Sequence, residues 1–435
     1  MSFGIFRHKG LAPVGVLILI INCSDYKPRG RARESAFKTR PAPPYLPPIM
    51  KSVRLGIIGM GNIGSHHADY LLGGKVKRCE LKAVSDAYAD KLVSYQQRGM
   101  KVFDDGGELI RSGEVDAVII ATPHYQHTSL GIAALQAGLH VMVEKPISAH
   151  KADAERLIAV RRQHPRQVFA AMFQMRTEAR YAKIKKLIAG GGLGQIVRFS
   201  WISTEWFRTE AYYASGGWRA TWKGEGGGLL VNQCLHQLDM LQWLLGMPAR
   251  VRAFVQLGRF HNIEVEDNVT AYMEWPNAAT GVFVSSTGEA PGASRLEIAG
   301  EMGKLLLEND KLLFYRNEVS MFQQSQTSKL GFQKPGLWNV EIPFASEPAQ
   351  HATLTRNFVD AILDGAPLTA PGEEGIHSIE LANALLYSGL MKQTIELPLD
   401  GAVYEKKLNE LIAASKFEKK VAPISNEDFT KSFMR

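Results

Sequence analysis

The sequence is poor in cysteine and lacks the residue spacings that hold metals or disulfides. Cys23, Cys79 and Cys234 are scattered over 435 residues, which excludes a disulfide-stabilised or zinc-stabilised fold and favours a reducing compartment. The apolar run at residues 11–21 is too short to span a bilayer. We therefore predict a cytoplasmic protein that binds no metal and no membrane.

The sequence also lacks a basic surface in its main part. The net charge is +8, but residues 1–50 contain eight Lys or Arg residues against two acidic ones, which leaves +2 for residues 51–435. A nearly neutral domain has no electrostatic footprint for nucleic acid. We expect no nucleic-acid partner.

Residues 1–50 combine a basic start, an apolar run and a proline-rich stretch. Because Met50 directly precedes the first expected strand, we interpret them as a disordered, dispensable extension. The alternative is an export signal to the periplasm, since an apolar run of this length suits the central region of a secretory signal. No small-x-small cleavage site follows that run cleanly.

The remaining length predicts two domains, because it exceeds one ordinary core. Between residues 51 and 173, short apolar strands alternate with helices, as in a parallel sheet. Between residues 174 and 400 the strands are longer and alternate apolar with polar residues, as in an antiparallel sheet with one covered face. Residues 401–435 are expected to be a C-terminal tail.

A glycine-rich turn follows the first strand, which is apolar and β-branched. Gly59, Gly61 and Gly64 have the G-x-G-x-x-G spacing, which permits the turn, the approach of a pyrophosphate and the packing of a helix on the strand. Free N–H groups at the helix start, around Asn62 and Ile63, would bind the phosphates. The alternative is the βα turn of another doubly wound fold.

Asp86 ends the second apolar run, twenty-two residues after Gly64. An acid at this point binds the ribose hydroxyls of a dinucleotide. Its charge would repel a 2′-phosphate, and no Arg follows it immediately. We therefore predict NAD as the cofactor rather than NADP.

Two further motifs, at residues 121–127 and 144–146, follow strands whose carboxyl ends would line a cofactor crevice. A lysine at such a place can lower the pKa of a substrate hydroxyl and move its proton. Taken alone, a solvated surface lysine is the simpler interpretation. The candidates for cofactor contact in these motifs are Thr122, Pro123, His127, Glu144 and Lys145.

The last motif joins three glycines to polar residues on a helix expected from residue 229 onward. Asn232 and His236 would share one helix face, with Asp239 one turn further. His236 could take a hydroxyl proton while Asn232 or Asp239 orients its ring. A buried histidine bound to a carbonyl is the alternative.

In this order the motifs resemble those of the Gfo/Idh/MocA oxidoreductases, such as glucose-fructose oxidoreductase and inositol 2-dehydrogenase relatives. The resemblance covers residues 53–399 and includes the glycine turn, Glu144-Lys145-Pro146 and the glycine-rich helix. It implies a Rossmann domain with a doubly wound parallel sheet and a C-terminal α/β domain with a large open, mostly antiparallel sheet. It further implies a nicotinamide cofactor, sugar or polyol substrates, and homodimers or homotetramers assembled through that sheet.

Carried over residue by residue, the resemblance makes Lys145 and His236 catalytic. Asn232, which we count with them, stands where many family members have an aspartate paired with the histidine. Without that carboxylate an imidazolium at His236 is less stabilised, so we expect Lys145 to carry more of the proton transfer.

Substrate contacts are expected between the domains, where aromatic rings suit the C–H faces of a sugar and polar groups its hydroxyls. We predict an NAD-dependent dehydrogenase or reductase that transfers hydride between nicotinamide and a hydroxyl or ketone carbon of a cyclic sugar, glycoside or inositol. The alternatives are glycoside cleavage with transiently used NAD and a non-catalytic cofactor-binding regulator. The substrate-binding candidates are Lys145, Arg176, Trp218, Arg219, Trp222, Asn232 and His236.

Overall fold

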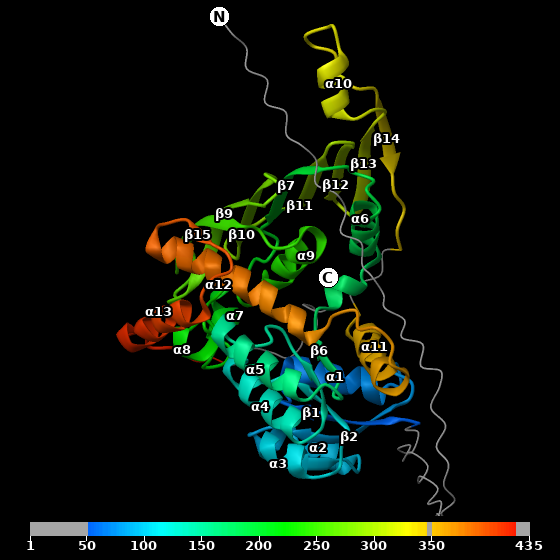
Figure 1. Ribbon diagram of the computed structural model, residues 1–435. Coiled ribbons are helices and arrows are strands. Elements are labelled where there is room, and N and C mark those ends of the chain that lie inside the picture. Colours follow the sequence, from blue (N-terminus) through cyan, green and yellow to red (C-terminus); the bar gives the residue numbers. More distant parts are fainter. Residues whose placement is uncertain (1–50, 346–349, 423–435) are drawn as a thin grey trace, which may run out of the picture. The chain divides into compact units, whose positions relative to one another are not determined.

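The structure, a computed structural model, describes residues 51–345 and 350–422 (Figure 1). The expected N-terminal extension and Cys23 lie outside the described residues, as does the chain from residue 423 onward. Cys79 and Cys234 are free thiols. No helix among the described residues is long and apolar enough to cross a lipid bilayer.

Six parallel strands form the first sheet, in the order β3-β2-β1-β4-β5-β6. Val53, Leu55 and Ile57 of the first strand are fully buried, because helices cover both faces of a parallel sheet. The order reverses between β1 and β4, and the carboxyl ends of the strands open a crevice at such a switch point. The predicted doubly wound sheet is confirmed. Its strands are β1 (Val53–Ile58), β2 (Cys79–Ser85), β3 (Lys101–Phe103), β4 (Ala117–Ile120), β5 (His140–Val143) and β6 (Phe169–Ala171).

Helices connect these strands, as the alternating pattern predicts. The helix expected at residues 127–137 begins three residues earlier, at His124, and Gly138 follows its end with a φ of +84°. The helix expected at residues 151–163 has those bounds. The connecting helices are α1 (Asn62–Leu72), η1 (Ala89–Lys91), α2 (Val93–Gln97), α3 (Gly106–Arg111), α4 (His124–Gln136) and α5 (Lys151–Gln163).

Nine strands form the second sheet, in the order β14-β13-β12-β11-β7-β10-β9-β8-β15. All neighbours pair antiparallel except β7 and β10, so the predicted mostly antiparallel sheet is also confirmed. Its strands are β7 (Ile196–Ser203), β8 (Arg250–Leu257), β9 (Glu266–Glu274), β10 (Thr280–Ser286), β11 (Ser294–Gly300), β12 (Gly303–Glu308), β13 (Lys311–Asn317), β14 (Leu337–Glu341) and β15 (Ile395–Glu396).

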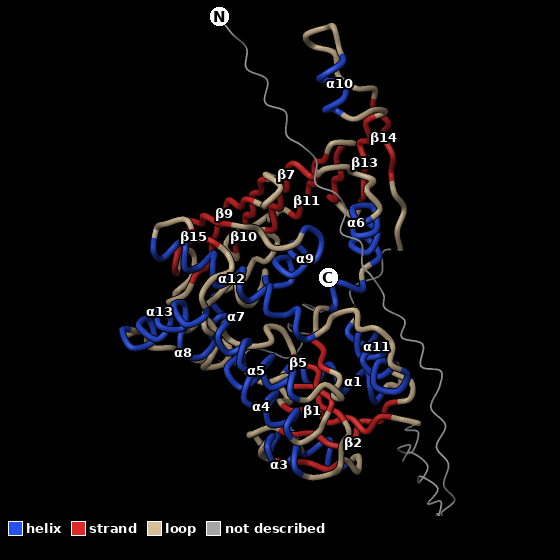
Figure 2. Tube along the Cα trace, viewed as in Figure 1, coloured by secondary structure: helices blue, strands red, loops and turns tan. Residues whose placement is uncertain are grey.

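Helices pack against the second sheet, and a later helix packs against the first sheet (Figure 2). Helix α12 packs against β8 and α9, and α6 packs against α9. Helix α11 packs against α1 and β1, so a late segment covers the Rossmann sheet. The remaining helices are η2 (Gln174–Thr177), α6 (Ala179–Ala189), α7 (Glu210–Ala214), α8 (Trp222–Glu225), α9 (Leu235–Leu245), α10 (Met321–Thr327), α11 (His351–Asp364), η3 (Gly372–Glu374), α12 (Gly375–Met391) and α13 (Gly401–Ala414).

The helix expected from residue 229 begins only at Leu235. The preceding residues form turns, because the side chain of Glu266 in β9 binds their backbone N–H groups. Its buried carboxylate accepts hydrogen bonds from Gly228 N at 3.0 Å and Leu230 N at 2.9 Å. Asn232 therefore lies in a turn, and it does not share a helix face with His236.

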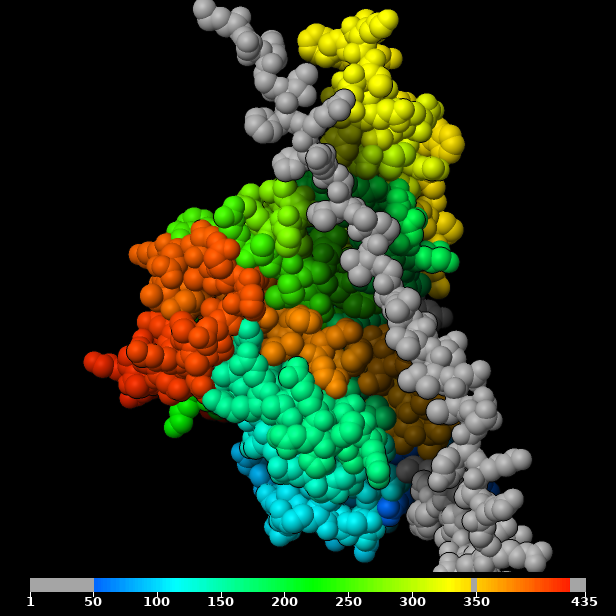
Figure 3. All heavy atoms as spheres, in the orientation of Figure 1, coloured from blue at the N-terminus to red at the C-terminus, as the bar shows by residue number. Residues whose placement is uncertain are grey.

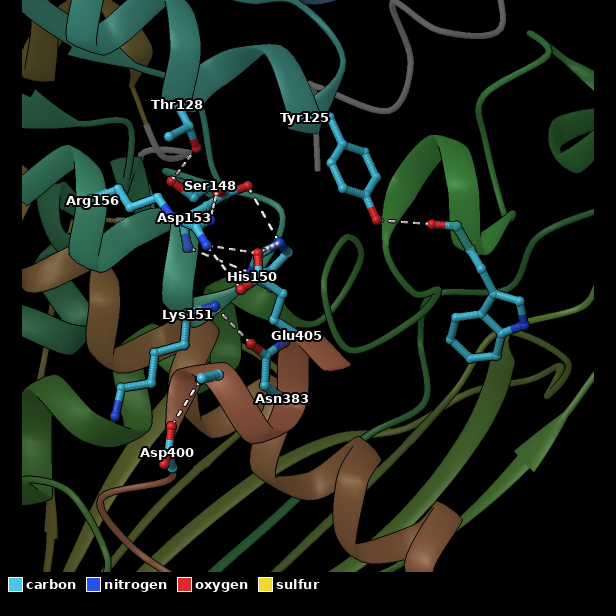
Figure 4. A network of polar contacts seen from close by, with 12 residues as sticks. Tyr125, Thr128, Ser148, His150, Lys151, Asp153, Arg156, Asn383, Asp400 and Glu405 are labelled. Carbon is cyan, nitrogen blue, oxygen red and sulfur yellow. Dashed lines mark hydrogen bonds and ion pairs between the residues drawn. The ribbon is translucent and has the colours of Figure 1, made fainter. Parts of the chain in front are cut away.

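The segment expected as a tail begins with a helix instead. In α13, Tyr404 and Leu408 are buried, and the helix packs against α5 and α8. In Figure 3 the red surface of α13 lies against the blue-green surface of α5. Lys151 of α5 joins this region, because its N–H donates to Asn383 Oδ1 at 2.9 Å (Figure 4). Its Nζ donates to Glu380 Oε1 at 2.9 Å.

Candidate active site

The three glycines of the turn after β1 each meet a different constraint. A Cβ on Gly59, whose φ is +97°, would lie 2.7 Å from the carbonyl oxygen of Ala121. A Cβ on Gly64 would lie 1.9 Å from the carbonyl oxygen of Gly59. Gly61 has nothing within 4 Å of such an atom. The first and third positions thus need glycine for packing, while the second leaves space above the turn.

The start of α1 is suited to a phosphate. Its N-cap is Gly61, so no side chain occupies the free N–H groups of the first turn. Asn62 is exposed and Ile63 half-buried. Thr122, whose N would lie 2.8 Å from a Cβ on Gly59, borders the turn. Its buried Oγ1 has no partner among the described residues, which fits a bound dinucleotide. Pro123, the N-cap of α4, follows it.

Asp86 is held beside this turn. Its Oδ2 accepts a hydrogen bond from Met60 N at 2.8 Å, and its Oδ1 accepts one from Tyr88 N at 3.0 Å. Lys91 Nζ lies 3.1 Å from both carboxylate oxygens. The carboxylate is thus fixed next to the glycine turn, with a lysine beside it, and its contact with a ribose stays a prediction.

Glu144 is a buried anion at the end of β5. Burial by itself would raise its pKa, but the hydrogen bond and charge of His67 outweigh this and lower the pKa to about 2. His67 Nε2 lies 2.8 Å from Glu144 Oε1, and His67 Nδ1 lies 2.6 Å from Tyr70 Oη. A buried chain of polar contacts thus holds Glu144, the residue directly before Lys145.

Lys145 reaches from the first sheet to the turns before α9. Its Nζ lies 3.2 Å from both the backbone oxygen and Oδ1 of Asn232. Burial lowers the pKa of Lys145, although the nearby Glu144, Tyr212 and Glu225 act in the opposite direction. The structure therefore brings two of the predicted catalytic residues into contact.

His236 lies in the first turn of α9. Its Nε2 is 3.3 Å from Gln174 Nε2, and its buried Nδ1 has no hydrogen-bond partner among the described residues. Burial, and secondarily the charge of Lys145, place the pKa of His236 well below its ordinary value. The ring is therefore neutral near neutral pH and keeps one nitrogen unused.

Asp239 and Arg176 have structural partners instead of the predicted roles. Arg176 donates two hydrogen bonds to Asp239, at 2.9 and 2.7 Å, and one to Glu374 at 2.5 Å. The side chain of Arg176 is fully buried. This geometry does not support the predicted contact of Arg176 with substrate, because its donors face the buried carboxylate of Asp239 and the partly exposed carboxylate of Glu374. Asp239 likewise pairs with Arg176 and Gln242, which accounts for both carboxylate oxygens.

His127 braces two loops rather than facing a cofactor. The side chain is buried, with Nδ1 2.7 Å from Pro146 O and Nε2 2.7 Å from Thr122 O. Both ring nitrogens are thus directed at backbone carbonyls. This geometry does not support the predicted cofactor contact of His127, whose ring instead joins the loops that carry Thr122 and Lys145.

The aromatic candidates separate into core and surface. Trp222 is only 4% exposed and belongs to the hydrophobic core, so its predicted contact with substrate is not supported. Trp218 is half-buried, and the Arg219 guanidinium lies 4.7 Å from its ring centre. Arg219 also donates to Tyr212 Oη at 2.8 Å. Trp218 and Arg219 thus remain candidates for a sugar ring.

Three residues of this region were missed from the sequence. Glu225, the last residue of α8, binds the Asn232 side-chain amide. Gln174 contacts His236, and Gln233 donates to Tyr212 Oη at 3.0 Å. The buried Oε1 atoms of Gln174 and Gln233 have no partners among the described residues. Only their positions in the sequence could have indicated these residues. Gln174 comes shortly after β6, Gln233 follows Asn232, and Glu225 precedes the three glycines.

A metal is poorly suited to the one cluster of possible ligands found in the described part of the chain. His150, Asp153 and Glu405 place ligand atoms within 4.8 Å of one another. Arg156, however, donates to Asp153 Oδ1 at 2.5 Å and to Glu405 Oε1 at 2.8 Å, as Figure 4 shows. A side-chain cation thus already pairs with both carboxylates.

The strand order and the glycine turn define a Rossmann-type nucleotide-binding domain. Residues 53–172 match the GFO/IDH/MocA oxidoreductase family, described as having an NAD-binding Rossmann fold, and residues 181–306 match the C-terminal domain of the same family. The chain belongs to the GFO/IDH/MocA family. The predicted family and NAD as the cofactor are confirmed.

Relatives with assigned activities extend over most of the chain. The myo-inositol 2-dehydrogenase of Thermotoga maritima is 24% identical over 359 residues, which are 79% of this chain and 98% of the relative. An NADP(+)-dependent scyllo-inositol 2-dehydrogenase of Bacillus subtilis is 27% identical over 371 residues, 80% of this chain and 96% of the relative.

Solved structures agree in fold. The WlbA dehydrogenase of Chromobacterium violaceum, in complex with NADH and UDP-GlcNAcA, has a TM-score of 0.70 and 25% identity, and the match covers 82% of this chain and 99% of that one. A levoglucosan dehydrogenase in complex with NADH and L-sorbose has a TM-score of 0.67 and 20% identity, with 81% and 100% covered.

The contrast between Gly61 and Gly64 predicts two different failures. Gly61→Ala should fold with an unchanged melting temperature but bind NAD about tenfold more weakly, because the new methyl group enters only the space above the turn. Gly64→Ala should lower the free energy of unfolding by about 1–3 kcal/mol through overpacking. Thermal melting and NAD titration of both variants test this, and equal melting temperatures would contradict it.

Proposed function

We propose that the protein is an NAD-dependent dehydrogenase of a cyclic polyol or sugar, with Lys145 and His236 handling the proton. The observation that carries the proposal is the contact between Lys145 Nζ and Asn232, in a region where buried polar atoms of Thr122, Gln174 and His236 are unpartnered. Unused buried donors and acceptors fit a polar ligand. The names of the inositol and levoglucosan dehydrogenases support the substrate class.

The chemistry divides between the cofactor and this chain. A bound nicotinamide supplies the hydride acceptor or donor. Lys145, whose pKa is lowered by burial, takes the proton of the substrate hydroxyl in the oxidative direction and returns it in the reductive one. Asn232 Oδ1 accepts a hydrogen bond from Lys145 Nζ and so aims the amine. The His236 ring is neutral, and its Nδ1 has no partner among the described residues. It orients the substrate by binding a second hydroxyl, and it can share the transferred proton with Lys145.

Oxidation by this arrangement has a defined pH dependence. Only the neutral amine of Lys145 accepts a proton, so the rate rises as pH passes upward through its pKa. Because burial lowers that pKa, the rise occurs at lower pH than for an exposed lysine. His236 is neutral over the same range, since its pKa is far below its ordinary value.

The open face of the second sheet supports the proposed homodimer or homotetramer. Phe254 on β8, Tyr272 on β9 and Val282 on β10 are 65%, 42% and 40% exposed, and Val282 pairs with Tyr272 across the sheet. Adjacent exposed apolar residues of this kind mark contact surfaces. Tyr272→Glu should therefore shift the sedimentation coefficient toward that of a monomer, and an unchanged value would refute this surface.

The cytoplasm remains the proposed location. Its support is the small number of cysteines and the free thiols of Cys79 and Cys234. Recovery of the protein from a periplasmic extract would favour the alternative, in which residues 1–50 direct export.

A substrate panel with a lysine variant tests the proposed activity. We expect NAD reduction with at least one of a set of inositols, sugars and glycosides, and a loss of about 10²–10⁴-fold in kcat/KM for Lys145→Ala. Lys223→Ala, which removes an exposed lysine, is the matched control and should retain full activity.

Three outcomes of the panel would contradict this proposal. Undiminished activity of Lys145→Ala would remove the lysine from the mechanism. Release of a glycoside's aglycone without net NADH formation would indicate the cleavage alternative. NAD binding without any turnover would favour a regulator.

The Asp86–Lys91 pair predicts how cofactor preference can be changed. Asp86→Ser should increase the ratio of kcat/KM with NADP to that with NAD about tenfold, because it removes a repulsive carboxylate and frees Lys91 for a 2′-phosphate. Asp86→Ser combined with Lys91→Ala should lose most of this gain. Equal ratios in the single and double variants would show that Lys91 does not reach the phosphate.

A further inference from the structure

Glu225 is a buried carboxylate placed directly behind Asn232. It ends α8 and is 1% exposed. Its Oε1 accepts a hydrogen bond from Asn232 Nδ2, and its Oε2 accepts one from Ala220 N at 2.5 Å. Both oxygens thus have donors, and one of them is the amide that contacts Lys145.

This contact determines which way the Asn232 amide faces. Since Nδ2 donates to Glu225, Oδ1 lies on the other side, 3.2 Å from Lys145 Nζ. The flipped amide would place Oδ1 against a carboxylate and two N–H donors against an ammonium or amine. Both contacts would then be repulsive when the groups are charged, so Glu225 excludes the flipped orientation.

Glu225 also has an electrostatic effect on Lys145. Burial raises the pKa of Glu225 above its ordinary value, although Arg219, its two hydrogen bonds and Lys145 act in the opposite direction. In return, Glu225 raises the pKa of Lys145 against the stronger effect of burial. Other charged or titratable groups also interact with these two residues. Around Lys145 they are Glu144, Tyr212, His124, His127, Arg219, Cys234, His236 and His351, and around Glu225 they are Arg219, Tyr213, Glu266 and Lys419.

We propose that Glu225 is a positioning residue that supplies, through the Asn232 amide, the carboxylate that Asn232 lacks. The arrangement Lys145, Asn232, Glu225 keeps a negative charge near the amine without a direct ion pair. A carboxylate in direct contact would hold Lys145 in the charged form more strongly, and a neutral residue alone would leave the amide free to flip. This inference rests on the proposed function of Lys145.

The test moves the carboxylate between the two positions. Glu225→Gln should lower kcat more than it raises KM, by about tenfold or more, and shift the low-pH limb of the kcat/KM profile to lower pH, because the amine loses a nearby negative charge. Glu225→Gln combined with Asn232→Asp should restore part of the activity and return the limb to higher pH. Asn232→Asp alone places two carboxylates together and should be destabilised.

The control removes a carboxylate that holds the same helix by another contact. Glu264 Oε1 accepts a hydrogen bond from Trp222 N at the start of α8, at 2.9 Å. Glu264→Gln should lower the melting temperature without moving the pH profile. The positioning role would be overturned if Glu225→Gln likewise lowered the melting temperature without moving the pH profile. It would also be overturned if adding Asn232→Asp to Glu225→Gln restored no activity. Undiminished activity of Lys145→Ala would instead overturn the function on which it rests.

Discussion

The candidate site depends on the contact of Lys145 with Asn232, which joins the Rossmann sheet to the turns before α9. Each partner is held from behind by a buried carboxylate. Glu144, bound to His67, precedes the lysine, and Glu225 binds the asparagine amide. The two carboxylates belong to segments about eighty residues apart in the chain. The amine can therefore be aimed only when both halves of the fold are in place.

Burial and charge act against each other throughout this region. Removing Lys145 and His236 from water lowers the pKa of both, which favours neutral bases. The surrounding carboxylates limit this effect, so the lysine keeps part of its affinity for a proton. Arg176 and Asp239 show the other solution, a buried ion pair in which both carboxylate oxygens accept hydrogen bonds from the guanidinium. Thr122 and Gln174, whose buried side-chain oxygens have no partner within the described residues, are the better candidates for ligand contact.

Local patterns predicted most of the fold, whereas long-range contacts decided the rest. Alternating strands and helices predicted the parallel sheet, and the glycine spacing predicted the turn after its first strand. The start of α9 could not be predicted, because Glu266, dozens of residues later, binds the backbone of Gly228 and Leu230. The same holds for Arg176, whose partner Asp239 is 63 positions away, and for His127, whose ring bridges two carbonyls. Motif order indicated Lys145 and His236, but nothing local distinguished Glu225 from a solvated acid.

The most direct measurement of the central claim is the titration of the Lys145 amine itself. Acylation of the folded protein at a series of pH values, followed by mass spectrometry of the labelled peptides, reports the pKa of each lysine without any substrate. We expect the pKa of Lys145 to be below the ordinary value of a lysine side chain, because burial outweighs the neighbouring carboxylates. A Lys145 pKa at or above that ordinary value would contradict this mechanism.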